Sequence, residues 1–423
     1  MNTTDPKIDV SRRQFLKRSS VLMAGAAAAP YVLNTQGAPA FPIRVGLIGC
    51  GGRGSGAVRD CHKSSKDVTI VAVADVFADR AKGCADSLNK EGHDVKPDRV
   101  FSGFDAYKKV LAVEDINYVI LATPPGFRPI HFPAAIAAGK NVFMEKPVAT
   151  DGPGLQAMYK AGEEAAKKGL GVVAGTQRRH QKSYLDTIKR IHDGAIGEVL
   201  VLRGYWNQGL IWNNPWDDKK SDMENNLRNW YHYVWLCGDH IVEQHVHNLD
   251  VCNWIMHNEH PIKAYGRGAR QVLKGRGHIY DHFSVEYEYR NGVRMFSQCR
   301  QIGNCTDNVS EAVVGTRGSS NPGGSIRIPG MDEWRSAGGG INPYVQEHAD
   351  LIASIRAGAP LNETKQVTDS TLTAIMGRES AYSGKVVDFE SVLAMNSIMP
   401  ERFDMNMSLP APVPAVPGVY KFD

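Results

Sequence analysis

The sequence has almost no excess of either charge. Its 423 residues include 49 basic and 45 acidic side chains, which gives a formal charge of +4. The first forty residues hold five basic and two acidic side chains, so the remainder of the chain is nearly neutral. Because net positive charge supplies most non-specific affinity for nucleic acids, we expect no nucleic-acid partner.

Cysteine is sparse and irregularly spaced. The seven cysteines are odd in number and include no C-x-x-C pair, which argues against a disulfide framework and against a thiolate zinc site. We therefore expect no resident metal. Cys299 and Cys305 could pair in an oxidising compartment, with free thiols as the alternative.

The apolar stretch near the N-terminus, Val21–Ala29, is too short and too rich in alanine to span a membrane stably. It follows Arg12-Arg13-Gln-Phe-Leu-Lys17 and precedes a small-residue cleavage site at Ala38-Pro39-Ala40. This order resembles a twin-arginine export signal. We therefore predict a signal peptide at residues 1–40, the twin-arginine export machinery as a partner, and a periplasmic location. A lasting membrane anchor and a chance arginine pair in a cytoplasmic tail are the alternatives.

A strand, a glycine-rich turn and a helix follow one another from Ile43. Ile43–Ile48 has the apolar, branched pattern of a buried parallel strand, and the next six residues fit G-x-G-x-x-G. A helix is expected over Ser55–Cys61. Such a turn lets backbone amides approach a pyrophosphate. The candidate cofactor-binding residues of the turn are Gly49, Gly51, Gly52, Arg53 and Gly54.

An acidic residue ends the next predicted strand, Val68–Ala74. Asp75 lies 26 residues after Gly49, close to the spacing of the acid that binds the ribose hydroxyls of NAD. Because a carboxylate at this position would repel the 2′-phosphate of NADP, we expect NAD as the cofactor, with NADP less favoured. A glycine turn followed by an ordinary aspartate at a strand end is the alternative.

The alternation of strands and helices continues to about residue 150. Strands are expected at Tyr118–Ala122 and Asn141–Met144, with a helix over His131–Ala138 between them. This order predicts an α/β Rossmann domain, a doubly wound parallel sheet, over residues 41–165. Ligands of such sheets bind at the carboxyl ends of the strands. The further candidates for cofactor contact at these ends are Thr123, Pro124, Glu145 and Lys146.

Taken together, the glycine motif, Asp75, Ala-Thr-Pro-Pro at 122–125 and Glu145-Lys146-Pro147 resemble the glucose–fructose oxidoreductase/inositol dehydrogenase (Gfo/Idh/MocA) family. The resemblance runs from about Ile43 to Phe389, and Glu-Lys-Pro is its most specific part. It implies an NAD-dependent oxidoreductase with a catalytic Lys146, whose ammonium can donate a hydrogen bond to a substrate oxygen. A solvated lysine at a strand end is the alternative.

The second half of the chain, residues 166–389, has patterns that suit an α+β domain. The alternating runs His278–Tyr289 and Val293–Gln301 are typical of antiparallel strands with one solvated face. The family resemblance implies an open, mostly antiparallel sheet whose free face forms a homo-oligomer. It also implies a final helix, about Thr368–Ser383, packed toward the Rossmann domain. Other expected elements are a strand at Leu170–Gly175, a helix at Tyr184–His192, a strand at Gly197–Arg203 and a C-terminal tail at 390–423.

Ionisable side chains concentrate in Gly238–Asp250. On a continuous helix Glu243 and His247 are i, i+4 neighbours, and His240 and Asp250 extend the same face. The resemblance implies a catalytic histidine at His247, flanked by acids at Glu243 and Asp250. Imidazole titrates near neutral pH and suits a base for a hydroxyl proton, with Glu243 orienting it. A structural helix and a metal cluster of His240, Glu243, His245 and His247 are the alternatives.

Five tryptophans fall within thirty residues and are interleaved with asparagine and aspartate: Trp206, Trp212, Trp216, Trp230 and Trp235. Aromatic faces stack on sugar rings and amides bind hydroxyls, so a carbohydrate pocket is one interpretation. An aromatic core or interface is the other. The candidate substrate contacts are Trp206, Asn207, Arg178, His245 and Asp250, and Arg179 and His180 are equally open to a structural role.

We therefore expect an exported NAD(P)-dependent oxidoreductase that transfers a hydride between nicotinamide and a ring carbinol of a sugar, sugar derivative or cyclitol. Because the twin-arginine route carries folded proteins and the periplasm offers no free nicotinamide pool, the NAD should be tightly bound. A redox-neutral NAD-dependent glycoside hydrolase, acting by oxidation, elimination, hydration and reduction, is the alternative. A non-catalytic sugar-binding protein is a second alternative.

Overall fold

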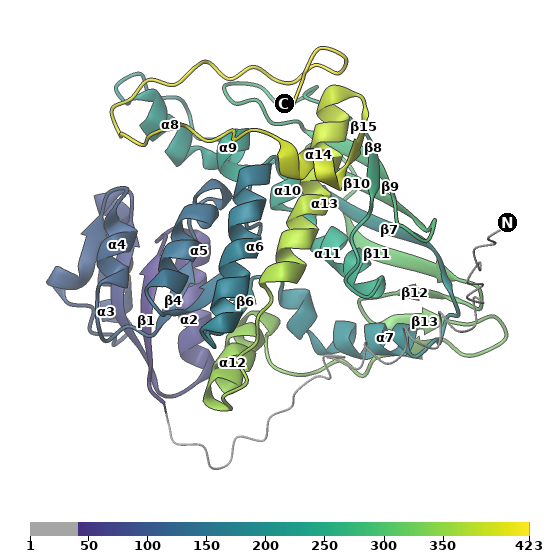
Figure 1. Cartoon of the computed structure of the whole chain (residues 1–423), viewed down its shortest axis with the longest axis horizontal. Helices are drawn as coiled ribbons and strands as arrows, with labels where there is room; N and C mark the ends of the chain where they lie inside the picture. The colour runs from purple at the N-terminus through teal and green to yellow at the C-terminus, as the bar shows by residue number, and fades with distance from the viewer. Residues whose placement is uncertain (1–40, 423) are drawn as a thin grey trace, which may run out of the picture. The chain divides into compact units, whose positions relative to one another are not determined.

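The computed structural model describes residues 41–422, which contain two β-sheets (Figure 1). The first sheet is parallel throughout, in the order β3-β2-β1-β4-β5-β6. It confirms the doubly wound Rossmann fold. Its strands are β1 (Ile43–Ile48), β2 (Val68–Asp75), β3 (Val100–Ser102), β4 (Tyr118–Leu121), β5 (Asn141–Met144) and β6 (Val172–Ala174). The predicted signal peptide at 1–40 lies outside the described residues.

Helices cover both faces of this sheet, as the fully buried strands require. One face packs against α2 (Gly52–Ser64), α3 (Ala78–Lys90) and α12 (Pro343–Arg356), with Val58, Leu88 and Leu351 in one apolar cluster with the strands. The other face packs against α4 (Ala106–Leu111), α5 (Arg128–Ala137) and α6 (Gly152–Lys167). The glycine-rich turn therefore follows a strand, β1, that helices hold in place on both faces of the sheet.

The second sheet has the order β14-β13-β12-β11-β7-β10-β9-β8-β15. Only β7 and β10 pair in parallel, so this sheet is mostly antiparallel, as expected. Its strands are β7 (Val199–Gln208), β8 (Lys263–Ala269), β9 (His282–Glu288), β10 (Arg294–Gln301), β11 (Asn308–Gly315), β12 (Ser319–Asn321), β13 (Ser325–Arg327), β14 (Trp334–Arg335) and β15 (Val386–Asp388).

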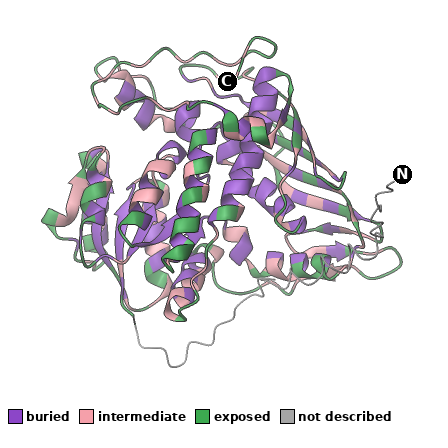
Figure 2. Cartoon of the chain, in the orientation of Figure 1, coloured by how far each residue is buried: buried purple, intermediate pink, exposed green. Residues whose placement is uncertain are grey.

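Helices cover one face of this sheet (Figure 1), and buried and exposed residues occur together along its strands (Figure 2). The covering helices include α11 (Val246–Ile255) and α13 (Thr364–Ser383). Along β9, Phe283, Val285 and Tyr287 are buried while Ser284 between them is exposed, the alternation of a one-sided sheet. The opposite face includes exposed Phe296 and Val386.

The predicted domain boundaries need correction. The first sheet continues to β6, beyond the predicted boundary at residue 165, because the chain returns to the sheet after α6. Helix α12, far along the chain, packs on α2 of the first domain. Helix α13 lies against both α6 and β8, which agrees with the packing expected for the final helix.

The predicted C-terminal tail is also more structured than expected. It begins with α14 (Phe389–Ala394), and its later apolar residues pack against the rest of the chain (Figure 1). The remaining helices are α7 (Lys182–His192), α8 (Asp222–Arg228), α9 (Val234–Cys237) and α10 (His240–Glu243). Across residues 41–422, no helix is long and apolar enough to cross a membrane.

The seven cysteines are all free. Cys299 is buried and Cys305 is exposed, so the pairing of these two thiols left open by the sequence is not formed.

Candidate functional site

A cavity of about 970 Å³ lies where the strands of the first sheet end. Residues at or just after the ends of β1, β2, β4 and β5 line one side of it, including Gly49, Asp75, Thr123 and Glu145. The second domain supplies the other side, including Trp206, Trp230, Tyr231, Glu243 and His247. The cavity therefore joins the predicted cofactor residues to the predicted catalytic residues.

The glycine turn brings backbone close to this cavity. Gly49 has φ +104°, and a Cβ on it would lie 2.6 Å from the Ala122 carbonyl carbon. A Cβ on Gly54 would lie 1.8 Å from the Gly49 carbonyl oxygen, so glycine is needed where α2 approaches β1. Gly51 and Gly52 have open space at the same position, and α2 begins at Gly52 with its free amides. This cradle fits the pyrophosphate of a dinucleotide.

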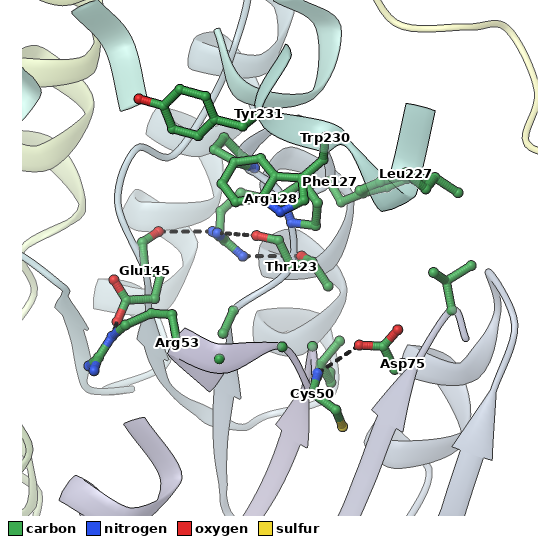
Figure 3. Close-up of a pocket in the computed structure, with 18 of the residues that line it drawn as sticks. Cys50, Arg53, Asp75, Thr123, Phe127, Arg128, Glu145, Leu227, Trp230 and Tyr231 are labelled. Atoms are coloured by element: carbon green, nitrogen blue, oxygen red, sulfur yellow. Dashed lines mark hydrogen bonds and ion pairs between the residues drawn. The ribbon is translucent and has the colours of Figure 1, made fainter. Parts of the chain in front are cut away.

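The Asp75 carboxylate is braced by two backbone amides. Oδ2 accepts from the Cys50 amide at 2.8 Å, and Oδ1 accepts from the Phe77 amide at 3.0 Å (Figure 3). Asp75 is 8% exposed and lines the cavity, and burial raises the pKa of its carboxyl group. Each oxygen keeps acceptor capacity for a ribose hydroxyl.

Arg128 ties the ends of β4 and β5 together, and Arg53 pairs with Glu145 from α2. The buried Arg128 donates from Nε to the Glu145 carbonyl oxygen at 3.0 Å and from Nη2 to the Thr123 carbonyl oxygen at 2.8 Å (Figure 3). Burial lowers the pKa of Arg128 to about 10. Arg53 donates from Nε to the Glu145 carboxylate at 2.5 Å. Pro124 lies on the cavity wall between these anchors.

Arg128 was missed as a site residue by sequence reasoning. The sequence feature that could have indicated Arg128 is its position at the start of a mostly apolar helix. A charged side chain that is buried there needs specific partners.

Lys146, Glu243 and His247 meet at the junction of the two domains. Lys146 Nζ donates to the Glu243 carbonyl oxygen at 2.6 Å and lies 3.2 Å from Glu243 Oε1. The His247 ring stacks on Trp206, with ring centroids 5.5 Å apart and an interplanar angle of 20°. All of these side chains line the cavity.

The surroundings of His247 favour its neutral form. Burial, followed by the charges of Lys146, Arg178 and Arg53, holds the pKa of His247 well below its usual range. The neutral ring has an acceptor nitrogen at pH 7, as a general base requires.

The interpretation of Gly238–Asp250 as one helix is wrong. Helix α10 ends at Glu243 and α11 begins at Val246, with His245 at the junction. The i, i+4 relation of a continuous helix therefore does not hold. Glu243 pairs with Lys146 and not with His247, so the predicted orientation of His247 by Glu243 is also corrected.

Two predicted substrate contacts lie away from the cavity. The His245 ring is fully buried with Nε2 2.7 Å from Ser297 Oγ. Asp250 accepts from Arg179 at 2.8 and 2.9 Å and from Ser370 Oγ at 2.8 Å. Because both side chains are buried and paired inside the protein, we assign both of them structural roles.

The histidines and Glu243 of the alternative metal cluster are not arranged to bind one metal ion. His240 is buried, with Nδ1 2.8 Å from the Tyr231 hydroxyl. Within the described part of the chain, no three His, Cys, Asp or Glu side chains are grouped to hold a metal ion.

Three of the five clustered tryptophans line the cavity, and the other two do not. Trp206, Trp212 and Trp230 line the cavity, together with Tyr231. Trp235 belongs to an apolar cluster with Phe127, and Trp216 lies under the guanidinium of Arg276.

The two remaining predicted substrate contacts lie beside the cavity rather than on its wall. Asn207 follows Trp206 on β7 and so points to the opposite face of the strand. Arg178 pairs with Glu311 and lies over the Trp206 ring, 5.7 Å from its centroid. Arg178 therefore supports the cavity wall and does not face the substrate.

Comparisons with known proteins agree with this arrangement. Residues 43–175 match the model described as "Oxidoreductase family, NAD-binding Rossmann fold", and residues 184–321 match the "GFO/IDH/MocA C-terminal domain". Inositol 2-dehydrogenase of Gluconacetobacter diazotrophicus is 27% identical over 332 residues, which are 75% of this chain and 87% of that protein. A "Glycosyl hydrolase family 109 protein" of Streptomyces coelicolor is 30% identical over 162 residues, 38% of this chain and 33% of that protein.

The fold also matches solved structures. A levoglucosan dehydrogenase in complex with NADH and levoglucosan has a TM-score of 0.66 at 20% identity, covering 82% of this chain and 99% of that one. An aldose-aldose oxidoreductase from Caulobacter crescentus has a TM-score of 0.66 at 17% identity with the same coverage.

Proposed function

This chain belongs to the GFO/IDH/MocA oxidoreductase family, and we propose that it uses NAD to oxidise a ring hydroxyl of a sugar, a sugar derivative or a cyclitol. One observation carries the proposal. A single cavity holds the glycine turn and Asp75 at one part, and Lys146 and His247 at another. A dinucleotide bound along the turn would have its reactive ring near the base.

Each part of the cavity has a separate task. The amides of the Gly51–Gly54 turn would bind the pyrophosphate, and Asp75 would bind the ribose hydroxyls. Thr123, Pro124 and Glu145 would border the nicotinamide. The bound cofactor supplies the hydride acceptor.

The chain's own residues supply the proton chemistry. A ring nitrogen of neutral His247 accepts the hydroxyl proton. The Lys146 ammonium donates a hydrogen bond to the same oxygen and stabilises its developing negative charge. Glu243 holds that ammonium in place through its carbonyl and its carboxylate. Trp206 and Trp230 offer aromatic faces on which a sugar ring can stack.

The test is a panel of inositols, anhydrosugars and aldoses mixed with the purified protein and NAD. We expect at least one compound to give lasting reduced-nicotinamide absorbance. With the His247→Ala variant, the same compound should reduce NAD at least about 100-fold more slowly. Substrate binding without any redox change or product would favour the sugar-binding alternative.

A redox-neutral glycoside hydrolase is the second candidate. It is supported by the similarity to the family 109 protein and by the predicted export signal at 1–40. A periplasmic enzyme would need to regenerate its NAD within each cycle, and we propose that the NAD is tightly bound for this reason. Release of aglycone from a chromogenic glycoside without lasting nicotinamide reduction would support this route over net oxidation.

Export and assembly belong to the same proposal. Replacing Arg12-Arg13 by two lysines should retain the protein in the cytoplasm if the twin-arginine machinery carries it. We also propose that the exposed face of the second sheet forms a homo-oligomer. Phe296→Asp on that face should lower the sedimentation coefficient, whereas an unchanged coefficient would argue against this interface.

A further inference from the structure

Residues 397–409, in the predicted C-terminal tail, lie along α8 (Figure 1). Backbone and side-chain hydrogen bonds hold the two segments together. The Met223 amide donates to the Met407 carbonyl oxygen at 3.3 Å, and the Leu409 amide donates to Asp222 Oδ2 at 3.0 Å. The Ser221 hydroxyl donates to the Met405 carbonyl oxygen. The segment is thus fixed to α8 at several points.

Its apolar side chains alternate with exposed ones. Phe403, Met405, Met407 and Leu409 face one apolar cluster, whereas the residues between them are exposed. A turn lies within this stretch, in which the Met407 amide donates to the Asp404 carbonyl oxygen at 3.1 Å. Residues 403–409 therefore pack on the cluster with every second side chain, although they form no strand.

Phe403 reaches the back of the cofactor cavity. Its ring stacks on Phe104, with centroids 5.6 Å apart and an interplanar angle of 27°, and lies 5.2 Å from the Phe127 ring. Phe104 and Phe127 both line the cavity, whereas Phe403 does not. Phe403 is therefore a second layer behind the wall of the cavity.

Helix α8 crosses to the first domain at the same place. The Arg228 guanidinium lies 3.9 Å from the Phe77 ring centroid, and its Nη1 lies 3.6 Å from Asp79 Oδ2. Leu227 is 2% exposed, lines the cavity and lies on the same side of it as Asp75 (Figure 3). Because Asp75 marks the ribose position, α8 closes the adenosine end of the cavity.

We propose that α8 and residues 397–409 form a clasp that retains NAD by slowing its release from the adenosine end of the cavity. The proposal rests on the proposed NAD binding and adds the part of the chain that controls dissociation. To open this end, α8 must separate from Phe77 and Asp79. The segment that is hydrogen-bonded to α8 is itself anchored to Phe104 and Phe127 of the first domain by the Phe403 ring. By linkage, NAD bound in the cavity should in turn stabilise the closed clasp.

The first test is the rate of NAD release from the full-length protein. Protein loaded with NADH is mixed with excess NAD, and the loss of bound-NADH fluorescence is followed. We expect Phe403→Ala to release NADH at least about tenfold faster than wild type. Val413→Ala, whose side chain is 77% exposed in the same C-terminal region, is the matched control and should not change the rate.

A second variant covers the case in which Phe403→Ala does not fold. Arg228→Ala removes a partly exposed side chain that bridges the two domains, and we expect release to become several-fold faster. Thermal melting of the cofactor-free forms checks that each variant is folded. Release within twofold of wild type in every folded variant would overturn the proposal.

Limited trypsin digestion tests the linkage without any turnover. Arg402 is exposed and directly precedes Phe403, so its peptide bond is a trypsin site within the clasp. We expect NAD to slow cleavage at this bond, measured by mass spectrometry, while cleavage at other exposed sites is unchanged. Equal cleavage with and without bound NAD would contradict the clasp. Failure to bind NAD at all would instead contradict the proposed function.

Discussion

Replacing His247 by alanine separates proton transfer from cofactor binding. The variant loses the imidazole that we propose as the base, and loss of a general base lowers turnover by about 10²–10⁴-fold. His247 belongs to the second-domain wall, stacked on Trp206, while the glycine turn and Asp75 belong to the first domain. We therefore expect the dissociation constant for NAD to change by less than about threefold, or ~0.7 kcal/mol.

The assay combines steady-state turnover with NADH titration by fluorescence. His282→Ala on β9, which does not line the cavity, is a histidine-to-alanine control and should retain wild-type turnover. Because truncation of His247 leaves room beside Trp206, added imidazole should restore part of the lost turnover. Turnover within about threefold of wild type, or NAD affinity that falls in step with turnover, would refute the reasoning.

Three further changes test other parts of the site. Asp75→Ser removes a charge-assisted ribose contact worth about 1.5–3 kcal/mol, so NAD affinity should fall about 10–100-fold and NADP affinity much less; an unchanged ratio of dissociation constants would exclude Asp75 as the ribose acid. Arg178→Gln removes a positive charge that lowers the pKa of His247, so this pKa should rise. The acid limb of the pH profile of kcat/KM should then move to higher pH. An acid limb that stays in place would mean that His247 is not the titrating base. Gly54→Ala should destabilise the fold by about 1–3 kcal/mol or more, because its Cβ would meet a backbone carbonyl, whereas Gly52→Ala should not; chemical denaturation measures both.

The first sheet was predictable because its signals are local. A buried strand, a glycine turn, a helix and an acid follow one another within residues 43–75, and each constrains the next. Lys146 and His247 could also be placed, since Lys146 lies just after the end of a strand and His247 matches a family motif. In the structure, Lys146 and His247 line the same cavity.

The errors concern contacts between distant segments. Nothing local to Pro343–Arg356 says that this helix packs on α2. The break after Glu243 depends on tertiary contacts of His245 and Asp250, which draw their side chains toward Ser297 and Arg179. The alternating apolar residues from Phe403 to Leu409 were a usable signal, but one whose partner on α8 lies about 180 residues away.

The most direct measurement of the central claim is the transfer of deuterium from substrate to cofactor. The substrate found in the panel is labelled at the carbon that bears the reacting hydroxyl, and the nicotinamide is recovered after one turnover for mass spectrometry. We predict one deuterium on the reduced nicotinamide with the wild-type protein, and none above background with Lys146→Met in the same time. Product formed with the label still on its carbon, and a cofactor without deuterium, would contradict net hydride transfer from the substrate to the cofactor.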